Sequence, residues 1–328
     1  MKTRDTEYLY ATTRIRSLEK GLLDQNATDR LVEVSGIEDM AKIMSELGYP
    51  NLQVAGIKAI ENSLFLARKE TFSLVSEISP KSELCEIFCL RYDYHNIKAI
   101  LKSMASDESC DGLLIDAGRF SPEFLVTAMR EMDYRELPSM LKSAIEEARE
   151  TLARTNDPQL FDFILDRAYF AEIEELAQMS GSKFLSGYVK CLIDTANLRA
   201  TLRSLRQVKD VAFLNNALQK GGNIPADKFI SVLSSDISLA DALKGTFLET
   251  AAEKANLSGS LVAFERECDD AIMAYLRSAR YVAFGEEPLI AYVAAREADI
   301  MTIRIILAGK VQELPHDEIR ERLRASYV

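Results

Sequence analysis

A pattern of nine residues occurs three times in this chain, at intervals of about 100 residues. It reads Asp-x-x-(Asn or Thr)-(Ile or Leu)-(Lys or Arg)-x-x-Leu, and it begins at Asp93, Asp194 and Asp299. The intervals are 101 and 105 residues (194 − 93 and 299 − 194). Repeats of this length have the size of a small domain, so the pattern predicts a triplicated domain and not a thin solenoid.

The stretches between the repeats are typical of amphipathic helices. Segments such as AGIKAIENSLFLARKETFSLVSEIS place apolar residues three or four positions apart, which is the spacing of one helix face. Gly and Pro are scarce and gather at boundaries such as GYPN, ISPKS and GGNIP. No convincing set of alternating strands is present. We therefore predict an all-α fold.

The similarity between the three copies extends upstream of each Asp without a gap. A small residue marks the same point in each copy, at Ser79, Ser180 and Gly285. Each copy is therefore predicted to end in a hairpin of two long helices joined by a short turn, with the Asp pattern on the second helix.

Further downstream, GRFSPEFLVTAM at 118–129 resembles GNIPADKFISVL at 222–233. Ser121 followed by Pro122 has the form of a helix N-terminus with Pro in the first turn. These short helices are predicted to open the next unit. The sequence thus predicts three helical domains with an extra helix at the C-terminus, and their ranges are 1–106, 107–208 and 209–328.

The polar residues of the pattern have a structural and a catalytic interpretation. Asp93 and Asn96 are neighbours along one helix border, whereas Lys98 lies about 140° from Asp93 and so on another face. A buried Asp needs a hydrogen-bonded partner, which we expect from another helix. Three equivalent active sites in one chain would be unusual, so we favour a structural role that fixes helix packing. The residues concerned are Asp93, Asn96, Lys98, Asp194, Asn197, Arg199, Asp299, Thr302 and Arg304.

A metal or cofactor site is not favoured by the spacing of possible ligands. Cys85 and Cys89 are four residues apart, and only His95 lies near enough in sequence to join them. The residues aligned with His95 are Ala196 and Met301, so the His is not part of the repeat. The chain has no Glu-x-x-His, Cys-x-x-Cys, phosphate-binding Gly loop or Gly-x-Ser-x-Gly motif. We predict no catalytic residue, no metal and no cofactor.

Charge and hydropathy constrain the partners and the compartment. The net charge of −11 disfavours direct binding to nucleic acid or to anionic lipid. No segment has the ~18 consecutive apolar residues of a membrane span, and the charged N-terminus is unlike a signal peptide. Five scattered cysteines indicate reduced thiols. We expect a cytoplasmic protein that reaches a membrane only through other proteins.

Several stretches together carry a family resemblance. The chain starts with YLYATTRIRSLEKGLL, continues with RLVEVSGIEDMAKIMSELGYP, and then has LRYDYHNIKAILKS and its two later echoes. In this order, and over essentially the whole chain, these stretches resemble the C subunit of the archaeal and bacterial V/A-type ATPases, a relative of the d subunit of the eukaryotic V-ATPase. Two positions depart from the pattern: Ala11 replaces the Asp in the first stretch, and Thr302 replaces Asn in the last copy.

The resemblance implies a fold and a function. The fold would be a funnel of three similar helical domains around a pseudo-threefold axis. The protein would be a non-catalytic subunit of the central stalk of a rotary ATPase. It would seat the central axle subunits on the membrane ring of proteolipid subunits, and it would transmit torque between ATP turnover and the transport of H⁺ or Na⁺. It would lie in the cytoplasm, peripheral to the membrane. The alternative is a helical scaffold unrelated to ATPases.

The equivalent turns of the three hairpins are candidates for an interface on one rim of such a funnel. The short helices at 121–132 and 225–234 are candidates for the opposite surface. The candidate rim residues are Ser79, Pro80, Ser180, Gly181, Gly285 and Pro288.

Overall fold

The protein is helical throughout the part of the chain that the structure describes. The computed structural model describes residues 5–328 apart from 54–55, 82, 107, 111 and 236. Every regular element in these ranges is a helix, which confirms the all-α prediction. No helix of the described residues is long and apolar enough to cross a lipid bilayer.

Six helices form three successive pairs, as the repeat predicted. A short turn joins the first two pairs, whereas a 3₁₀ helix and a loop join the third. The pairs are α4 (Ile57–Ile78) with α5 (Glu83–Ser106), α8 (Pro158–Ser180) with α9 (Lys183–Arg206), and α14 (Val262–Leu276) with α15 (Glu287–Val311). The second helix of each pair carries the Asp pattern. The other elements are η1 (Asp5–Tyr8), α1 (Leu9–Leu18), η2 (Glu19–Gly21), α2 (Gln25–Glu33), α3 (Ile37–Glu46), α6 (Pro122–Glu131), α7 (Ser139–Thr155), α10 (Val211–Ala217), α11 (Ala226–Ser234), α12 (Leu239–Ala242), α13 (Glu249–Glu253), η3 (Arg277–Tyr281) and α16 (His316–Arg322).

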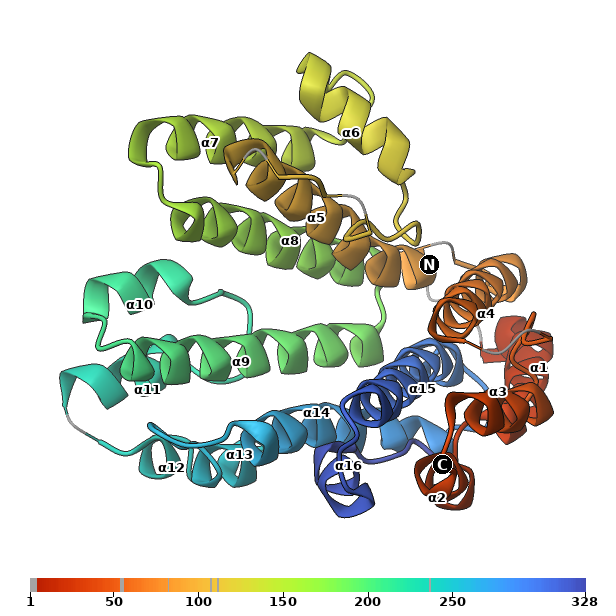
Figure 1. The fold of residues 1–328 in the computed structure, drawn as a ribbon. Helices are drawn as coiled ribbons and strands as arrows, with labels where there is room; N and C mark the ends of the chain where they lie inside the picture. Colours follow the sequence, from red (N-terminus) through yellow and green to blue (C-terminus); the bar gives the residue numbers. More distant parts are fainter. Residues whose placement is uncertain (1–4, 54–55, 82, 107, 111, 236) are drawn as a thin grey trace.

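The helices are arranged in three lobes that spread from a common centre (Figure 1). The first lobe contains α5–α8, the second lobe contains α9–α14, and the third lobe combines α15 and α16 with α1–α4. In each lobe the helix with the Asp pattern packs along the first long helix of the following repeat, and in the third lobe α15 packs along α4. The third lobe therefore joins the two ends of the chain.

The lobes of the structure do not coincide with the units of the sequence repeat. The two helices of each pair contribute to different lobes, although α8 and α9 also pack against each other. The lobes begin at the turns, whereas the sequence repeat divides the chain after residues 106 and 208. Those domain boundaries and the funnel shape stay predictions.

The cation of each Asp pattern ties the two long helices of its lobe together. The pairs are Lys98 with Asp166, Arg199 with Glu265 and Asp269, and Arg304 with Glu61. They link α5 to α8, α9 to α14 and α15 to α4, so the cation lies on a different face from the Asp, as its spacing predicted. All these side chains are partly exposed, and such pairs contribute only about 0–1 kcal/mol each. Apolar burial is therefore the main source of stability in the lobes.

The centre of the molecule contains a buried ion pair within the third lobe, and a tyrosine of the first lobe contacts it. Arg68 of α4 and Glu297 of α15 are 2.7 Å apart, and their side chains are 4% and 12% exposed. Tyr92 of α5 donates its hydroxyl hydrogen to Glu297. Apolar residues from the N-terminal halves of α5, α9 and α15 surround this point and form one continuous core.

The core of the third lobe is shared between the two ends of the chain. Ile303 of α15 is fully buried with Leu31 of α2 and Leu64 of α4. Each of these side chains removes apolar surface from water, so the N-terminal and C-terminal segments stabilise each other.

We expect Ile303→Ala to lower the free energy of unfolding by about 2–5 kcal/mol, because it leaves a cavity in this shared core. Urea unfolding followed by circular dichroism measures the change. The control is Met301→Ala, two residues away on the same helix, where the side chain is 48% exposed and the change should stay within about 0.5 kcal/mol. Equal effects of the two substitutions would contradict the described packing.

Candidate functional site

The carboxylate of Asp93 holds the loop that leads from α5 into α6. Its Oδ1 accepts hydrogen bonds from the backbone N–H groups of Arg119 at 2.9 Å and Phe120 at 3.3 Å. Its Oδ2 accepts one from Nε of Arg119 at 2.8 Å. Asp93 is fully buried. We call the hydrogen bonds between a repeated Asp and the loop before the next short helix a clasp.

Asn96 holds the same loop a few residues earlier. Its Nδ2 donates to the carbonyl of Ile115 at 2.8 Å, and its Oδ1 accepts from the N–H of Ile115 at 2.9 Å. The side-chain amide thus satisfies both main-chain polar groups of one residue, as a neighbouring strand would.

The second copy repeats this geometry. Asp194 accepts from the backbone N–H groups of Asn223 at 2.9 Å and Ile224 at 3.0 Å. Asn197 bonds both main-chain groups of Gln219, at 2.9 and 2.7 Å. In both copies the partner of the Asp comes from a loop. The expectation that another helix would supply it was wrong, because loop N–H groups are free to turn toward a buried carboxylate whereas those inside a helix are already bonded.

The third clasp joins the two ends of the chain and has fewer hydrogen bonds. Asp299 accepts one, from the N–H of Leu23 at 3.1 Å, and lies 3.6 Å from Arg296. Thr302 replaces Asn and makes no hydrogen bond to the described residues. Leu23 precedes Asp24, the N-cap of α2, just as Phe120 precedes Ser121, the N-cap of α6.

A glycine lies against the Asp in the first two clasps. A Cβ atom at Gly118 would come within 2.1 Å of Oδ1 of Asp93, and one at Gly222 within 2.0 Å of Oδ1 of Asp194. A Cβ at Gly21, in the third loop, would meet nothing within 4 Å. The main chain therefore approaches the carboxylate closely in two copies and less closely in the third.

Burial determines the protonation behaviour of these carboxylates. It raises the pKa of Asp93 against the opposing effect of Arg119, and it raises the pKa of Asp194 against its backbone N–H donors. The pKa of Asp299 is raised to about 7, because burial dominates and only Arg296 and the N–H of Leu23 favour the charged form.

The geometry favours a structural role for the clasps over a catalytic one. Each carboxylate is bound by its own loop, and the first two are saturated with donors. Burial raises the pKa of the Cys85 and Cys89 thiols to about 12, so neither is a reactive thiolate at neutral pH. His95 lies with Nε2 3.0 Å from the carbonyl of Leu113, on the clasped loop. In the described part of the chain no three potential metal ligands gather.

The three turns between the long helices meet at one point, which we call the hub (residues 79–81, 181–182 and 282–286). Lys81 connects them: its ammonium group donates to the carbonyl of Ser180 and lies 3.7 Å from Glu286. Thr12 of α1 donates to the carbonyl of Gly285 at 3.1 Å. The N-terminal helix thus covers part of the third turn.

The six candidate rim residues differ in exposure. Ser180, Gly285 and Pro288 are buried, Ser79 is half-buried, and Pro80 and Gly181 are exposed. Their role in an interface stays a prediction. The large apolar side chains exposed at or near the hub are those of Met179, Tyr281 and Phe284.

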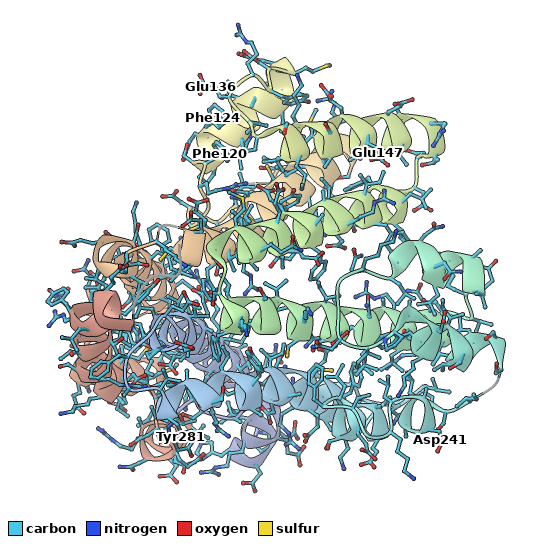
Figure 2. The ribbon with its side chains drawn as sticks, turned by 180° about the vertical axis from the view of Figure 1, so that it is seen from behind. Phe120, Phe124, Glu136, Glu147, Asp241 and Tyr281 are labelled. Atoms are coloured by element: carbon cyan, nitrogen blue, oxygen red, sulfur yellow. The ribbon has the colours of Figure 1, made fainter. Side chains whose placement is uncertain are left out.

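Two of these apolar side chains occupy equivalent positions in the repeat. Met179 is 67% exposed and Phe284 is 49% exposed, while the corresponding Ile78 is half-buried. Tyr281, at the end of η3, is 91% exposed. Figure 2 shows Tyr281 well apart from Phe120 and Phe124 of the first lobe.

The two short helices predicted for the opposite surface exist. The segment at 121–132 contains α6, and the segment at 225–234 contains α11. As predicted, Ser121 caps α6 and accepts from the N–H of Phe124 at 3.2 Å. Both helices follow a clasped loop, so the clasps fix where they begin.

A comparison with protein families identifies the chain. A profile of the ATP synthase (C/AC39) subunit family matches residues 11–322. The chain belongs to this family. The family match thus spans all three clasps and the hub.

Individual relatives match over nearly the whole chain. The C subunit of the V-type sodium ATPase of Enterococcus hirae is 26% identical over 98% of this chain and 99% of its own length. The C subunit of the A-type ATP synthase of Methanocaldococcus jannaschii is 23% identical over 96% of this chain and 86% of its own length. The corresponding protein of Haloferax volcanii is 23% identical, with 96% of both chains covered.

Sequence reasoning missed the loop residues that complete the clasps and the lysine that connects the turns. The aligned loops GRF and GNI did carry a signal, because a Gly beside a buried Asp allows backbone N–H groups to approach it. No sequence pattern indicated the role of Lys81, because its partners are a carbonyl group and a carboxylate that are remote in sequence.

We expect Gly118→Ala and Gly222→Ala each to destabilise the protein by about 1–3 kcal/mol, because the added methyl group collides with the clasped carboxylate. Thermal and urea unfolding measure this change. Gly21→Ala is the matched control, with a change within about 0.5 kcal/mol. A destabilisation by Gly21→Ala as large as that of the other two would refute the clasp geometry.

We expect the stability of the wild-type protein to fall as the pH rises from about 4 to about 7, relative to Asp299→Asn. A carboxyl group whose pKa is raised by folding holds its proton more tightly in the native state, so its contribution is complete below the unfolded pKa and is lost through the folded pKa. The shift from 3.8 to about 7 corresponds to at most about 4 kcal/mol.

Urea unfolding of both proteins at pH 4.5, 6 and 8 tests this expectation. The charged and titratable groups around Asp299 include Arg296, Tyr49, Tyr292, Arg320 and Arg324. Asn keeps the shape of Asp and can still accept from Leu23, so the difference between the two curves isolates the carboxyl group. Parallel curves across this range would show that Asp299 does not titrate as described.

Proposed function

We propose that this protein is a non-catalytic rotor subunit of a V/A-type rotary ATPase. It seats the central axle on the membrane proteolipid ring and transmits torque between ATP turnover and the transport of H⁺ or Na⁺. The observation that carries the proposal is the family match over residues 11–322, together with relatives named as the C subunit of a V-type sodium ATPase and of A-type ATP synthases.

The mechanical design of the chain supports this proposal. A subunit that transmits torque must resist twisting, and its helices are connected by polar contacts at both ends of each lobe. Lys81 connects the turns at the hub, the clasps hold the loops further out, and the buried pair of Arg68 and Glu297 lies between them. Breaking a buried pair by removing one partner typically costs about 3–5 kcal/mol, so such a contact resists deformation of the lobes.

The surface supports two separate binding faces. The hub exposes Met179, Tyr281 and Phe284, while α6 and α11 lie at the outer ends of clasped loops. Aromatic and Met side chains are enriched in protein interfaces. We assign one face to the axle and the other to the proteolipid ring. In this function the protein is cytoplasmic and peripheral to the membrane.

A scaffold unrelated to ATPases is the alternative function. It would have the same clasps and hub but no affinity for an axle subunit or a proteolipid ring. The experiment that separates the two is co-purification of the full chain with the axle subunits and, separately, with the detergent-solubilised ring. The rotor function predicts stable complexes with both. Failure to bind either at low ionic strength would overturn it.

We expect Met179→Asp and Phe284→Asp to weaken binding to one of these two partners at least tenfold, because each places a charge in an apolar contact. Binding to the other partner should not change. Met104→Asp, at a site of similar exposure (48%) near the end of α5, is the control and should change neither affinity. Circular dichroism and thermal unfolding check that all three variants are folded. Unchanged affinity for both partners would exclude the hub as a binding face.

A further inference from the structure

The third lobe contains a cavity beside its clasp. The cavity has a volume of about 220 Å³ and is partly open to solvent. Asp299 and Thr302 of α15 line one side, with Thr28 of α2. Arg320 of α16 and Arg324 of the C-terminal segment line the other side.

Main chain fills the corresponding space in the first two lobes. There the residue equivalent to Thr302 is Asn96 or Asn197, and its amide bonds both main-chain groups of Ile115 or Gln219. In the third lobe the chain arrives from α1 and η2 instead, so that only Leu23 among the described residues donates to the repeated Asp through its main chain. The cavity is thus the place that a clasped segment would occupy.

Two polar groups facing this cavity lack partners among the described residues. Oδ1 of Asp299 accepts no hydrogen bond from them, because Leu23 and Arg296 both approach Oδ2. The hydroxyl group of Thr302 likewise makes none. The two residues are only 5% and 8% exposed, and what remains exposed of them lies at the cavity. The free atoms indicate a ligand that offers hydrogen-bond donors.

The charges on the opposite wall are already balanced. Arg320 pairs with Asp29, Glu33 and Asp317, and Arg324 pairs with Asp269. An anion would therefore gain little from these guanidinium groups and would be repelled by Asp299. A neutral ligand with N–H donors and carbonyl acceptors fits both walls, and the peptide main chain has both groups.

We propose that this cavity binds an extended peptide segment of a partner protein, whose main-chain N–H groups donate to Asp299 as the loop amides donate to Asp93 and Asp194. The partner would thereby supply the segment that the third lobe lacks. The proposal concerns the chain alone and does not depend on its assignment to a rotary ATPase.

The chain's own second loop provides a suitable probe. A synthetic peptide of residues 217–224 (ALQKGGNI) contains the main-chain groups that Asn197 and Asp194 bind in the second lobe. Its affinity for the purified full-length protein is measured by isothermal titration calorimetry. The control peptide is N-methylated at the amides of Asn223 and Ile224, which removes those two donors and keeps the side chains.

Two substitutions in the cavity test the contact in opposite directions. Thr302→Asn restores the residue of the first two copies and should tighten binding about fivefold to tenfold, since it adds hydrogen bonds to the peptide main chain. At pH 8, where the carboxyl group is charged, Asp299→Asn should weaken binding about tenfold, because it removes the charged acceptor. Met301→Asn, on the adjacent exposed position, is the matched control and should have no effect.

The proposal is supported if the unmodified peptide binds, the N-methylated peptide does not, and Thr302→Asn tightens binding. A misfolded variant cannot produce such a gain, so the result does not depend on the stability of Asp299→Asn. Absence of binding to the wild-type protein and to Thr302→Asn at about 1 mM peptide overturns the proposal. Equal binding of both peptides, or a Thr302→Asn affinity equal to wild type, overturns it as well.

Discussion

The free-energy cost of burying a carboxylate is the constraint on which the rest of this structure depends. Asp93 and Asp194 are fully buried, and a charge removed from water must be compensated by hydrogen bonds. The donors are backbone N–H groups of the loops at 119–120 and 223–224. Those loops are therefore held against the long helices, and the short helices α6 and α11 begin where the loops end. One polar interaction thus fixes the outer part of two lobes.

The same interaction has another effect in the third lobe, where it connects the two ends of the chain. Asp299 holds Leu23 through a single hydrogen bond, and the apolar core around Ile303 supplies most of the contact between α15 and the N-terminal helices. The third lobe therefore joins two segments that are far apart in sequence, and only non-covalent contacts hold them together. In the proposed rotor function, this junction and the hub at Lys81 would carry load between the first and last helices.

Much of the fold could be predicted from the sequence, because helices, turns and caps depend on local patterns. The long helices, the turns after Ser79 and Ser180, and the cap at Ser121 follow from periodicity and from residue types. The loop partners of Asp93 could not be predicted in this way. The loop glycine lies 25 residues after Asp93 but 28 residues after Asp194 (118 − 93 and 222 − 194). Contacts across such variable spacings depend on tertiary packing. The placement of the two helices of each pair in different lobes likewise depends on tertiary packing.

We propose that this protein is the mechanical link between ATP turnover and ion transport. The most direct measurement uses the membrane-bound ATPase of the source organism, stripped of this chain and reconstituted in vesicles, with ATP hydrolysis and ion transport recorded together. We expect hydrolysis by the soluble head to persist without the chain, ATP-driven ion transport to be lost, and the purified protein to restore it. Ion transport that remains coupled to hydrolysis in the complete absence of the chain would contradict the account.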